Sequence, residues 1–393
     1  MTTASAQRDV TAEAVIDRVK ALIPTIAERA AEGDRDRSVP AEIVAALVEA
    51  GVARVLVPAA FGGAELGLET WFEIVHEIAK SDMSTAWIAS LAMHHPHYIA
   101  QFPLAAQEEV WRDGPDVVIA ASIAPVCKIE PVEGGYRVTG RSPFTSGINN
   151  STWAMVSGFV PGSGPGPDWR FFLMPVSDYE VLDTWDVVGM RGTGSNTIVT
   201  EGVFVPEHRV LAYADLNEGV SPGSKVHDNP MYALPFKSYS SLTFSVPILG
   251  AARGVYEKFV AWTASRVAAG GAAVRDFTSV RVKLSRAAAS IDAAELMLRR
   301  ILDTAIGPVR PTEDDRARAM RDYSRAVELA VEAIDALVAI GGSAVFGASH
   351  PIQRAWRDVH FASTHISLNP ETNYDHYGRL ALGMGRAPQN LSY

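Results

Sequence analysis

The feature that most constrains the fold is a double change of residue pattern along the chain. Residues 1 to about 115, and those after about 235, contain long segments whose apolar side chains recur at helical spacing. Between them, short runs of β-branched and aromatic residues alternate with turn-forming residues. This order predicts an α+β protein with an N-terminal helical domain at 1–116, a central antiparallel β domain at 117–234 and a C-terminal four-helix bundle at 235–393.

Six segments of the middle region have the composition of strands. They are rich in valine, isoleucine, phenylalanine and tryptophan, and turn-forming residues separate them. Glu133, Gly134 and Gly135 supply a tight hairpin turn between the second and third segments, whereas 162–168 predicts a longer loop. The expected strands are 117–123, 127–132, 136–144, 152–160, 169–176 and 197–205.

Four long periodic segments predict the C-terminal bundle. Thr312 and Asp315 have the spacing of a capping box at the start of the third segment. Pro247 lies inside the first segment, so we expect a kink or a later start of that helix. The expected helices are 238–268, 276–306, 312–340 and 350–366.

Composition excludes several classes of protein. The hydrophobic fraction is 48%, and no uninterrupted apolar run approaches the roughly 18 residues of a membrane helix. The formal net charge of −10 comes without a basic stripe, which argues against a nucleic-acid partner. The single cysteine, Cys127, cannot form an internal disulfide, and the N-terminus has no apolar signal-peptide core. We therefore expect a cytoplasmic protein that binds neither nucleic acid nor membrane.

Five stretches distributed over nearly the whole chain carry a family resemblance. They are LVPAAFGGAELG, EIAKSDMSTAW, GGYRVTGRSPFTSG, VVGMRGTGSNTIVTEGVFVPEHRV and GGSAVFGASHPIQRAWRD. Together with the helix, sheet, helix order, they resemble the acyl-CoA dehydrogenase superfamily. The resemblance implies the acyl-CoA dehydrogenase-like fold for the entire chain.

The residue that a dehydrogenase of this family needs most is missing. Such an enzyme uses a carboxylate base to remove a proton from its thioester substrate. Counting from the Arg357-Asp358 pair, the usual position of the base falls on Ile366. The alternative position falls near Ser240 or Ser241. Neither isoleucine nor serine has the proton affinity that this step requires.

Three other features resemble the two-component flavin-dependent monooxygenases of the same fold. They are the SG that ends SPFTSG, the histidine-rich stretch before FPLAAQEEVW, and a histidine shortly after RDVH. The resemblance implies an oxygenase component that takes reduced flavin, FMNH2 or FADH2, from a separate NAD(P)H:flavin reductase. It also implies O2 as co-substrate, a C4a-hydroperoxyflavin, and hydroxylation of a small, aromatic or polycyclic substrate. A homotetramer is implied too, because a neighbouring subunit completes the flavin site in this family.

The resemblance assigns roles to individual residues. Ser146 would lie at the N5/C4a edge of the flavin, and His365 on the substrate side, as a general base or as a donor to the peroxide. The expected cofactor contacts are Ser122, Phe144, Thr145, Ser146, Arg191, Thr193, Ser195 and Arg266. The expected substrate contacts are His94, His95, His97 and Tyr98. We expect no metal site, since the adjacent His94 and His95 cannot share a helix face.

Several interpretations remain open from the sequence. Ser146 can be an ordinary turn residue, His365 a packing residue, and Arg191 part of a glycine-rich structural turn. Within the monooxygenase branch, oxidation of nitrogen or sulfur would require no removal of a substrate proton. Two further hypotheses are an acyl-CoA dehydrogenase whose base lies elsewhere, and a binding protein that retained the fold without catalysis.

Overall fold

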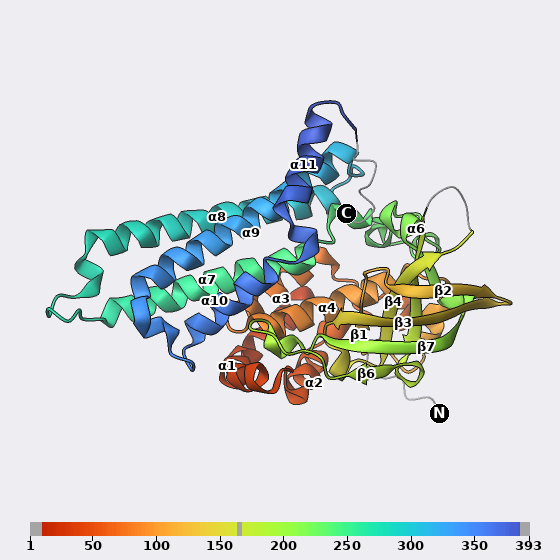
Figure 1. The fold of residues 1–393 in the computed structure, drawn as a ribbon, viewed down its shortest axis with the longest axis horizontal. Helices are drawn as coiled ribbons and strands as arrows, with labels where there is room; N and C mark the ends of the chain where they lie inside the picture. The colour runs from red at the N-terminus through yellow and green to blue at the C-terminus, as the bar shows by residue number, and fades with distance from the viewer. Residues whose placement is uncertain (1–9, 163–166, 386–393) are drawn as a thin grey trace.

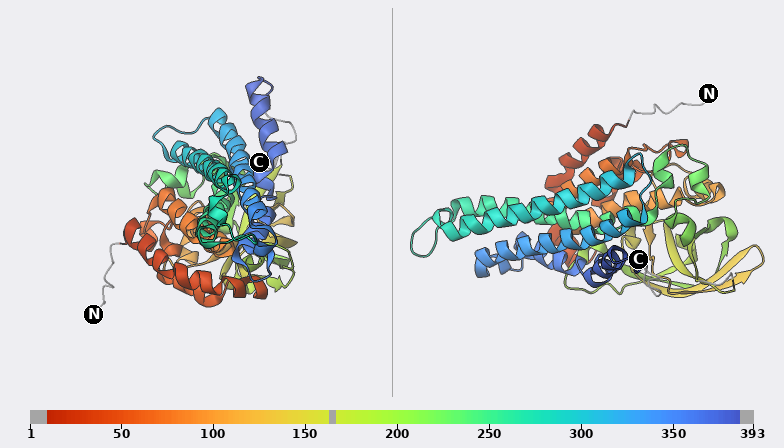
Figure 2. Two further views of the ribbon diagram at one scale, coloured as in Figure 1. Left: turned by 90° about the vertical axis from the view of Figure 1, so that its left-hand side faces the viewer. Right: turned by 90° about the horizontal axis from the view of Figure 1, so that it is seen from above.

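The computed structural model describes residues 10–162 and 167–385. An elongated helix bundle lies at one end of the molecule and the β-sheet at the other, with the N-terminal helices against both (Figures 1 and 2). The centre of the predicted loop at 162–168 falls outside the described residues.

The N-terminal region is helical, as predicted. Thr11 caps its first helix by accepting a hydrogen bond from the Ala14 backbone N–H at 3.2 Å. The helical sequence on either side of residue 80 forms two helices, because Asp82 takes an extended conformation and caps the second one. The helices are α1 (Ala12–Asp36), α2 (Ala41–Glu49), α3 (Gly67–Ala79), α4 (Met83–Ile99) and α5 (Leu104–Val110).

The central sheet contains the six expected strands and two short ones that the sequence pattern missed. Its order is β6-β7-β3-β2-β4-β5-β8, with β1 beside β4. The expectation of an antiparallel sheet was wrong for two pairs, since β4 runs parallel to both β1 and β2. The strands are β1 (Ile119–Ala121), β2 (Cys127–Val132), β3 (Gly135–Thr145), β4 (Trp153–Val160), β5 (Asp168–Pro175), β6 (Glu180–Leu182), β7 (Asn196–Pro206) and β8 (Val210–Ala212).

The C-terminal region contains the four predicted long helices and one more that was not predicted. Thr312 and Asp315 form the expected capping box, with hydrogen bonds in both directions. The additional helix, α11, begins at Pro370 and packs against α9. The five helices are α7 (Leu242–Ser265), α8 (Thr278–Ile306), α9 (Glu313–Gly341), α10 (Pro351–Ala362) and α11 (Pro370–Ala381). A short helix that was not predicted, α6 (Tyr213–Asn217), precedes them within the region expected to be the β domain.

Pro247 lies inside α7, and α4 compensates for the hydrogen bond that it cannot make. The helix begins at Leu242, later than residue 238, as the proline suggested. Proline has no N–H to donate to the carbonyl of Thr243, four residues earlier. The Ser90 hydroxyl of α4 donates to that carbonyl instead, at 3.2 Å.

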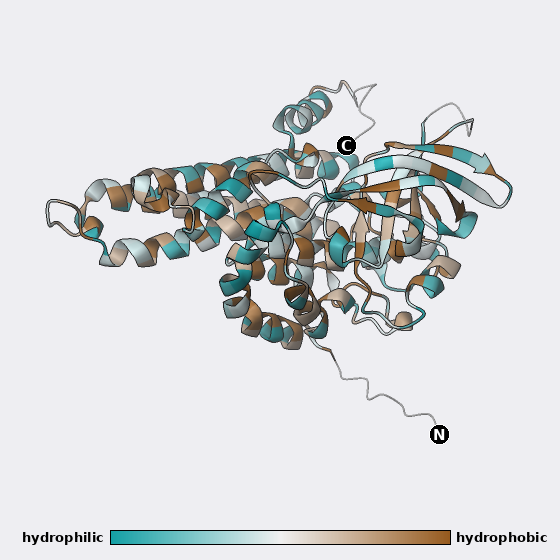
Figure 3. Cartoon of the chain, turned by 60° about the horizontal axis from the view of Figure 1, so that its bottom comes forward, coloured by the Kyte–Doolittle hydropathy of each residue, from teal (hydrophilic) through white to brown (hydrophobic). Residues whose placement is uncertain are grey.

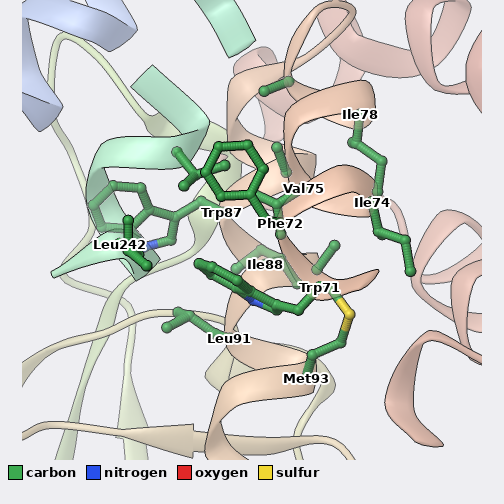
Figure 4. Close-up of a cluster of buried hydrophobic side chains, with 14 of the residues drawn as sticks. Trp71, Phe72, Ile74, Val75, Ile78, Trp87, Ile88, Leu91, Met93 and Leu242 are labelled. Atoms are coloured by element: carbon green, nitrogen blue, oxygen red, sulfur yellow. The ribbon is translucent and has the colours of Figure 1, made fainter. Parts of the chain in front are cut away.

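The hydrophobic core is thickest where α3, α4 and α7 meet. Every residue of α4 is buried, and its Trp87 lies in one cluster with Trp71 and Phe72 of α3 and Leu242 of α7 (Figure 4). Hydrophilic and hydrophobic residues otherwise alternate along the helices and strands, as expected for elements with one buried face (Figure 3).

One stretch of the described residues, Glu313–Phe346, is long and apolar enough to cross a membrane by length and composition. In this structure α9, which forms most of the stretch, packs against α7, α8 and α11. Core helices of globular proteins have the same composition.

A buried carboxylate joins the bundle to the sheet region. Asp358 of α10 is 2% exposed, and its Oδ1 accepts a hydrogen bond from the Met190 backbone N–H at 2.6 Å. Burial raises the pKa of Asp358 to about 7, with repulsion from Asp82 and Asp34 acting in the same direction. The folded protein therefore binds a proton that the unfolded chain releases. The stability contributed by this residue is lost as the pH rises through about 7.

Asp358→Asn should raise the melting temperature more at about pH 8 than at about pH 5, because the amide still accepts from Met190 but carries no buried charge. The gain in the free energy of unfolding should differ between the two conditions by on the order of 1 to 3 kcal/mol. Thermal unfolding followed by circular dichroism measures this difference. Asp375→Asn, at an exposed position of α11, is the control. Equal shifts at both pH values would contradict the raised pKa.

Candidate active site

Helix α4 links the predicted site residues, because it contacts some of them and carries others. The Trp87 ring lies 6.0 Å from the His365 ring, centroid to centroid. The next residue, Ile88, packs against Gly147, where an added Cβ would lie 3.3 Å from its Cδ1. His95 follows eight residues after Trp87, which is about 12 Å along the helix axis. One helix thus contacts His365, contacts the neighbour of Ser146, and carries the histidine cluster.

His95 is held as a neutral imidazole with one free acceptor. Its Nδ1 lies 2.6 Å from the Ile119 carbonyl oxygen, which can only accept, so Nδ1 carries the proton. Burial lowers the pKa of His95 to about 4. The ring is consequently uncharged at neutral pH, and Nε2 presents a lone pair.

The two other histidines of the cluster are fully buried, and Tyr98 is buried beside them. His97 uses both nitrogens, because Nε2 donates to the Met231 carbonyl at 2.9 Å and Nδ1 accepts from the Tyr239 hydroxyl at 3.3 Å. His94 is fully buried, and its Nδ1 pairs with the Thr243 hydroxyl. Tyr98 stacks 5.1 Å from the His94 ring. Substrate contact is therefore possible for His94, His97 or Tyr98 only if neighbouring residues move. No metal-binding group of three or more ligands occurs in 10–162 or 167–385.

Ser146, Ser195 and Thr193 form a continuous hydroxyl chain. The Ser146 and Ser195 oxygens lie 2.7 Å apart, as do those of Ser195 and Thr193. Thr193 donates in turn to the Met190 carbonyl at 2.8 Å. The structure thus brings together three of the predicted cofactor contacts, although they are separated by up to 49 residues along the chain.

Phe144 presents its ring to solvent beside this hydroxyl chain. It is 66% exposed and has a left-handed backbone, with φ of 58°. Such a conformation is unfavourable for a bulky residue and is often found at functional sites. Its ring lies 5.9 Å from Trp185, which lies 5.6 Å from Phe361 of α10. This row of rings connects the end of β3 to the helix that precedes His365.

Three other expected cofactor contacts have structural partners. Thr145 is fully buried and its hydroxyl donates to the Ser142 carbonyl at 3.0 Å. The Ser122 hydroxyl donates to the Pro143 carbonyl at 2.9 Å. Arg191 donates to the carbonyls of Asp34 at 2.9 Å and Val187 at 2.7 Å. These bonds support the structural interpretation of Arg191.

Arg266 lies far from the other predicted site residues. It is at the C-terminal end of α7, the end of the bundle opposite the sheet (Figure 1). Its guanidinium group stacks on Trp262 at 4.2 Å and donates to the Gly341 carbonyl at 3.3 Å. Within one chain it cannot reach the hydroxyl chain, so a cofactor contact would require a second subunit.

His365 is held in the other neutral tautomer from His95. Its Nδ1 accepts a hydrogen bond from the Ser367 backbone N–H at 3.3 Å and lies 2.7 Å from the Ser367 hydroxyl. Since Nδ1 is the acceptor, the proton of the neutral ring is on Nε2. Burial lowers the pKa of His365 to about 4, and the ring stacks on Phe244 at 3.8 Å. His365 therefore presents a neutral N–H donor.

Sequence reasoning missed the residues that orient these groups. Ser367 carried a usable signal, because it follows His365 at the spacing of a helix cap. Trp185, Phe244 and Thr243 carried none, since they meet the site through contacts between distant segments.

The side chains present suit a planar ring with a polar edge. Phe144 offers an exposed aromatic face, Ser146 offers a hydroxyl oxygen, and the two histidines are uncharged. At the positions where a dehydrogenase carries its base, Ile366 is 57% exposed and Ser241 is buried. The chemistry of this donor set fits a flavin and provides no carboxylate for proton removal from a thioester.

Comparison with known proteins places the chain in a family. Residues 11–113 match the acyl-CoA dehydrogenase N-terminal domain, and 242–370 match the C-terminal domain. The chain is 36% identical to the flavin-dependent monooxygenase oxygenase subunit HsaA of Rhodococcus jostii, over 94% of this chain and 98% of HsaA. It is 33% identical to the oxygenase component of an FADH2-dependent resorcinol hydroxylase of a Rhizobium species, over 94% of each chain.

A solved structure agrees with this relationship. XiaF from a Streptomyces species, in complex with FADH2 and glycerol, superimposes with a TM-score of 0.88 at 29% identity, covering 97% of this chain and 98% of XiaF. The acyl-CoA dehydrogenase-like fold expected from the sequence is thereby confirmed. The chain belongs to the acyl-CoA dehydrogenase superfamily, among the oxygenase subunits of the flavin-dependent monooxygenases.

Proposed function

We propose that this protein is the oxygenase component of a two-component flavin-dependent monooxygenase, and that it hydroxylates a small aromatic or polycyclic substrate with reduced flavin and O2. Relatives named as oxygenase subunits and components support this function. The observation that carries it furthest is that α4 carries one neutral imidazole, the acceptor His95, and contacts another, the donor His365, through Trp87, where no carboxylate base is available.

The roles of this chain's residues follow from their hydrogen-bonding states. Phe144 and Ser146 would hold the ring of the reduced flavin, which supplies the electrons that activate dioxygen when it is bound. His365 would donate its Nε2 proton in a hydrogen bond to the oxygen being transferred. His95 would accept the proton of a phenolic hydroxyl at Nε2. The apolar walls of α4 and α7 would exclude water from both.

Several finer features belong to the same proposal. A separate NAD(P)H:flavin reductase would supply the cofactor, as either FMNH2 or FADH2, and the enzyme would act in the cytoplasm as a homotetramer. A contact of Arg266 with the cofactor would require this assembly, because only a neighbouring chain could bring it to the hydroxyl chain. We assign the domains as 1–116, 117–234 and 235–393, close to the changes from helices to strands and back.

Oxidation of nitrogen or sulfur is the second candidate reaction, and the polarity of His365 allows it. A donor N–H can assist oxygen transfer to any acceptor atom, whereas His95 is required only when the substrate loses a proton. A panel of phenols, amines and thioethers, supplied with reduced flavin in aerated buffer, distinguishes the two reactions. Bleaching of bound flavin by an acyl-CoA without oxygen would instead support a dehydrogenase.

His365→Ala should lower the hydroxylated product formed per reduced flavin by at least about tenfold, because one hydrogen bond to the transferred oxygen is lost. Hydrogen peroxide release should rise correspondingly. Chromatography of the product and a peroxide assay measure both quantities. His350→Asn is the matched control, since His350 caps the opposite end of α10 and asparagine can also cap. Unchanged product yield in His365→Ala would remove His365 from the mechanism.

Product yield per flavin should not change between about pH 6 and about pH 8. His95 stays neutral over this range, because burial lowers its pKa to about 4. His95→Gln should lower the yield with phenolic substrates more than with thioethers, which have no proton to give. A decline centred near pH 6.5 that disappears in His95→Gln would contradict the neutral acceptor.

A further inference from the structure

We propose that Ser195 and Thr193 fix the direction of the Ser146 hydroxyl, so that this oxygen acts only as an acceptor at the cofactor edge and favours reduced over oxidised flavin. The inference rests on the proposed function, which puts Ser146 beside the flavin N5. It assigns a positioning role to two residues that would otherwise be simple contacts, and it gives the site a means of selecting the redox state of its ligand.

The direction follows from the end of the hydroxyl chain. The Met190 carbonyl can only accept, so the proton of Thr193 points to it across 2.8 Å. A hydroxyl has one proton, and Thr193 must therefore accept from Ser195 at 2.7 Å. Ser195 has then used its own proton.

The same rule applies to the last link of the chain. Ser195 can only accept from Ser146, whose oxygen lies 2.7 Å away. The Ser146 proton thus points into the protein, toward Ser195. Both lone pairs of the Ser146 oxygen therefore remain for a ligand.

Several hydrogen bonds hold the Met190 peptide groups at which the hydroxyl chain ends. Met190 adopts a left-handed conformation with φ of 57°, and its N–H donates to Asp358 at 2.6 Å. Its carbonyl also accepts from the Trp185 indole at 3.0 Å and the Thr193 backbone N–H at 3.1 Å. Rotation of this carbonyl away from the hydroxyl chain would break the bonds from Trp185 and from the Thr193 backbone N–H.

Because the hydroxyl chain is buried, water cannot reverse the direction of its hydrogen bonds. Thr193 is 2% exposed and Ser195 is 4% exposed, so solvent cannot supply alternative donors or acceptors to either hydroxyl. Ser146 is half-buried and is the only member of the chain that is open to a ligand of substantial size. The redox preference is therefore set at the buried end and expressed at the accessible end.

The chemistry of the flavin N5 atom makes this direction consequential. Reduced flavin carries a hydrogen on N5 and donates it, whereas oxidised flavin presents only a lone pair there. An acceptor-only Ser146 forms a hydrogen bond with the reduced form and faces the oxidised form lone pair to lone pair. One made or unmade hydrogen bond of this kind changes affinity by about tenfold.

The test is the ratio of the dissociation constants for oxidised and reduced flavin, measured anaerobically with FAD and with FMN by fluorescence or calorimetry. Ser195→Ala removes the internal acceptor and lets the Ser146 proton turn toward the oxidised N5. The ratio should fall by about tenfold, chiefly because the oxidised form binds more tightly. Thr193→Val should produce the same change through the isosteric loss of one hydroxyl, and Thr193→Ser should restore the wild-type ratio.

Ser142→Ala is the matched control. Like Ser195, Ser142 is a buried serine, but it lies in β3 and its hydroxyl pairs with the Cys127 sulfur at 3.3 Å and not with the hydroxyl chain. Its loss should leave the ratio unchanged.

The possible failures are distinguishable. Equal weakening of both redox forms by Ser195→Ala and Thr193→Val, at a constant ratio, would show a purely structural role and overturn the inference while the proposed function stands. Absence of binding of either flavin form by the wild-type protein would overturn the proposed function itself.

Discussion

The turn at 189–195 is the constraint on which the arrangement of the protein depends, because helices from both ends of the chain meet the sheet there. Asp358 of α10 accepts from the backbone at its second residue, and Arg191 donates to the carbonyl of Asp34 in α1. Glycine is required at two positions. A Cβ at Gly189 would lie 2.4 Å from the Arg357 carbonyl oxygen, and one at Gly192 would lie 2.8 Å from the Ser84 side chain. The close approach of α4 and α10 to this turn positions the site.

The site combines uncharged hydrogen-bonding groups of defined polarity. Each histidine at its edge owes its tautomer to the backbone, through the Ile119 carbonyl for His95 and the Ser367 N–H for His365. Burial keeps both rings neutral because a charged imidazole would lose its hydration. Charged groups lie instead where α1 meets α10, and there Asp34 pairs with Arg357 at 2.9 Å. The protein thus separates the charges that hold its parts together from the neutral groups available to a ligand.

The sequence predicted the order of elements and the motifs that carry Ser146 and His365, because both are local patterns. It could not predict which way β4 runs beside β2, since strand direction depends on the path of the chain between them. The three-residue strands β6 and β8 were too short to show alternation. For the candidate site, the motif could not show that the Thr145 hydroxyl donates to the Ser142 carbonyl, because this bond depends on how the end of β3 folds. The proton direction in the hydroxyl chain required distances and a carbonyl end point, which no residue pattern contains.

The replacement of a hydrogen bond within α7, which Pro247 cannot make, by one from Ser90 of α4 affects how the protein folds. In an ordinary helix the first carbonyls accept hydrogen bonds from N–H groups of the same helix, so its first turn can form independently of other segments. In α7 the carbonyl of Thr243 is satisfied by Ser90, which lies 153 residues earlier in the chain. The first turn of α7 is therefore complete only when α4 is already beside it. This hydrogen bond couples the start of the bundle to the N-terminal helices, because the first turn of α7 gains it only after α4 has docked.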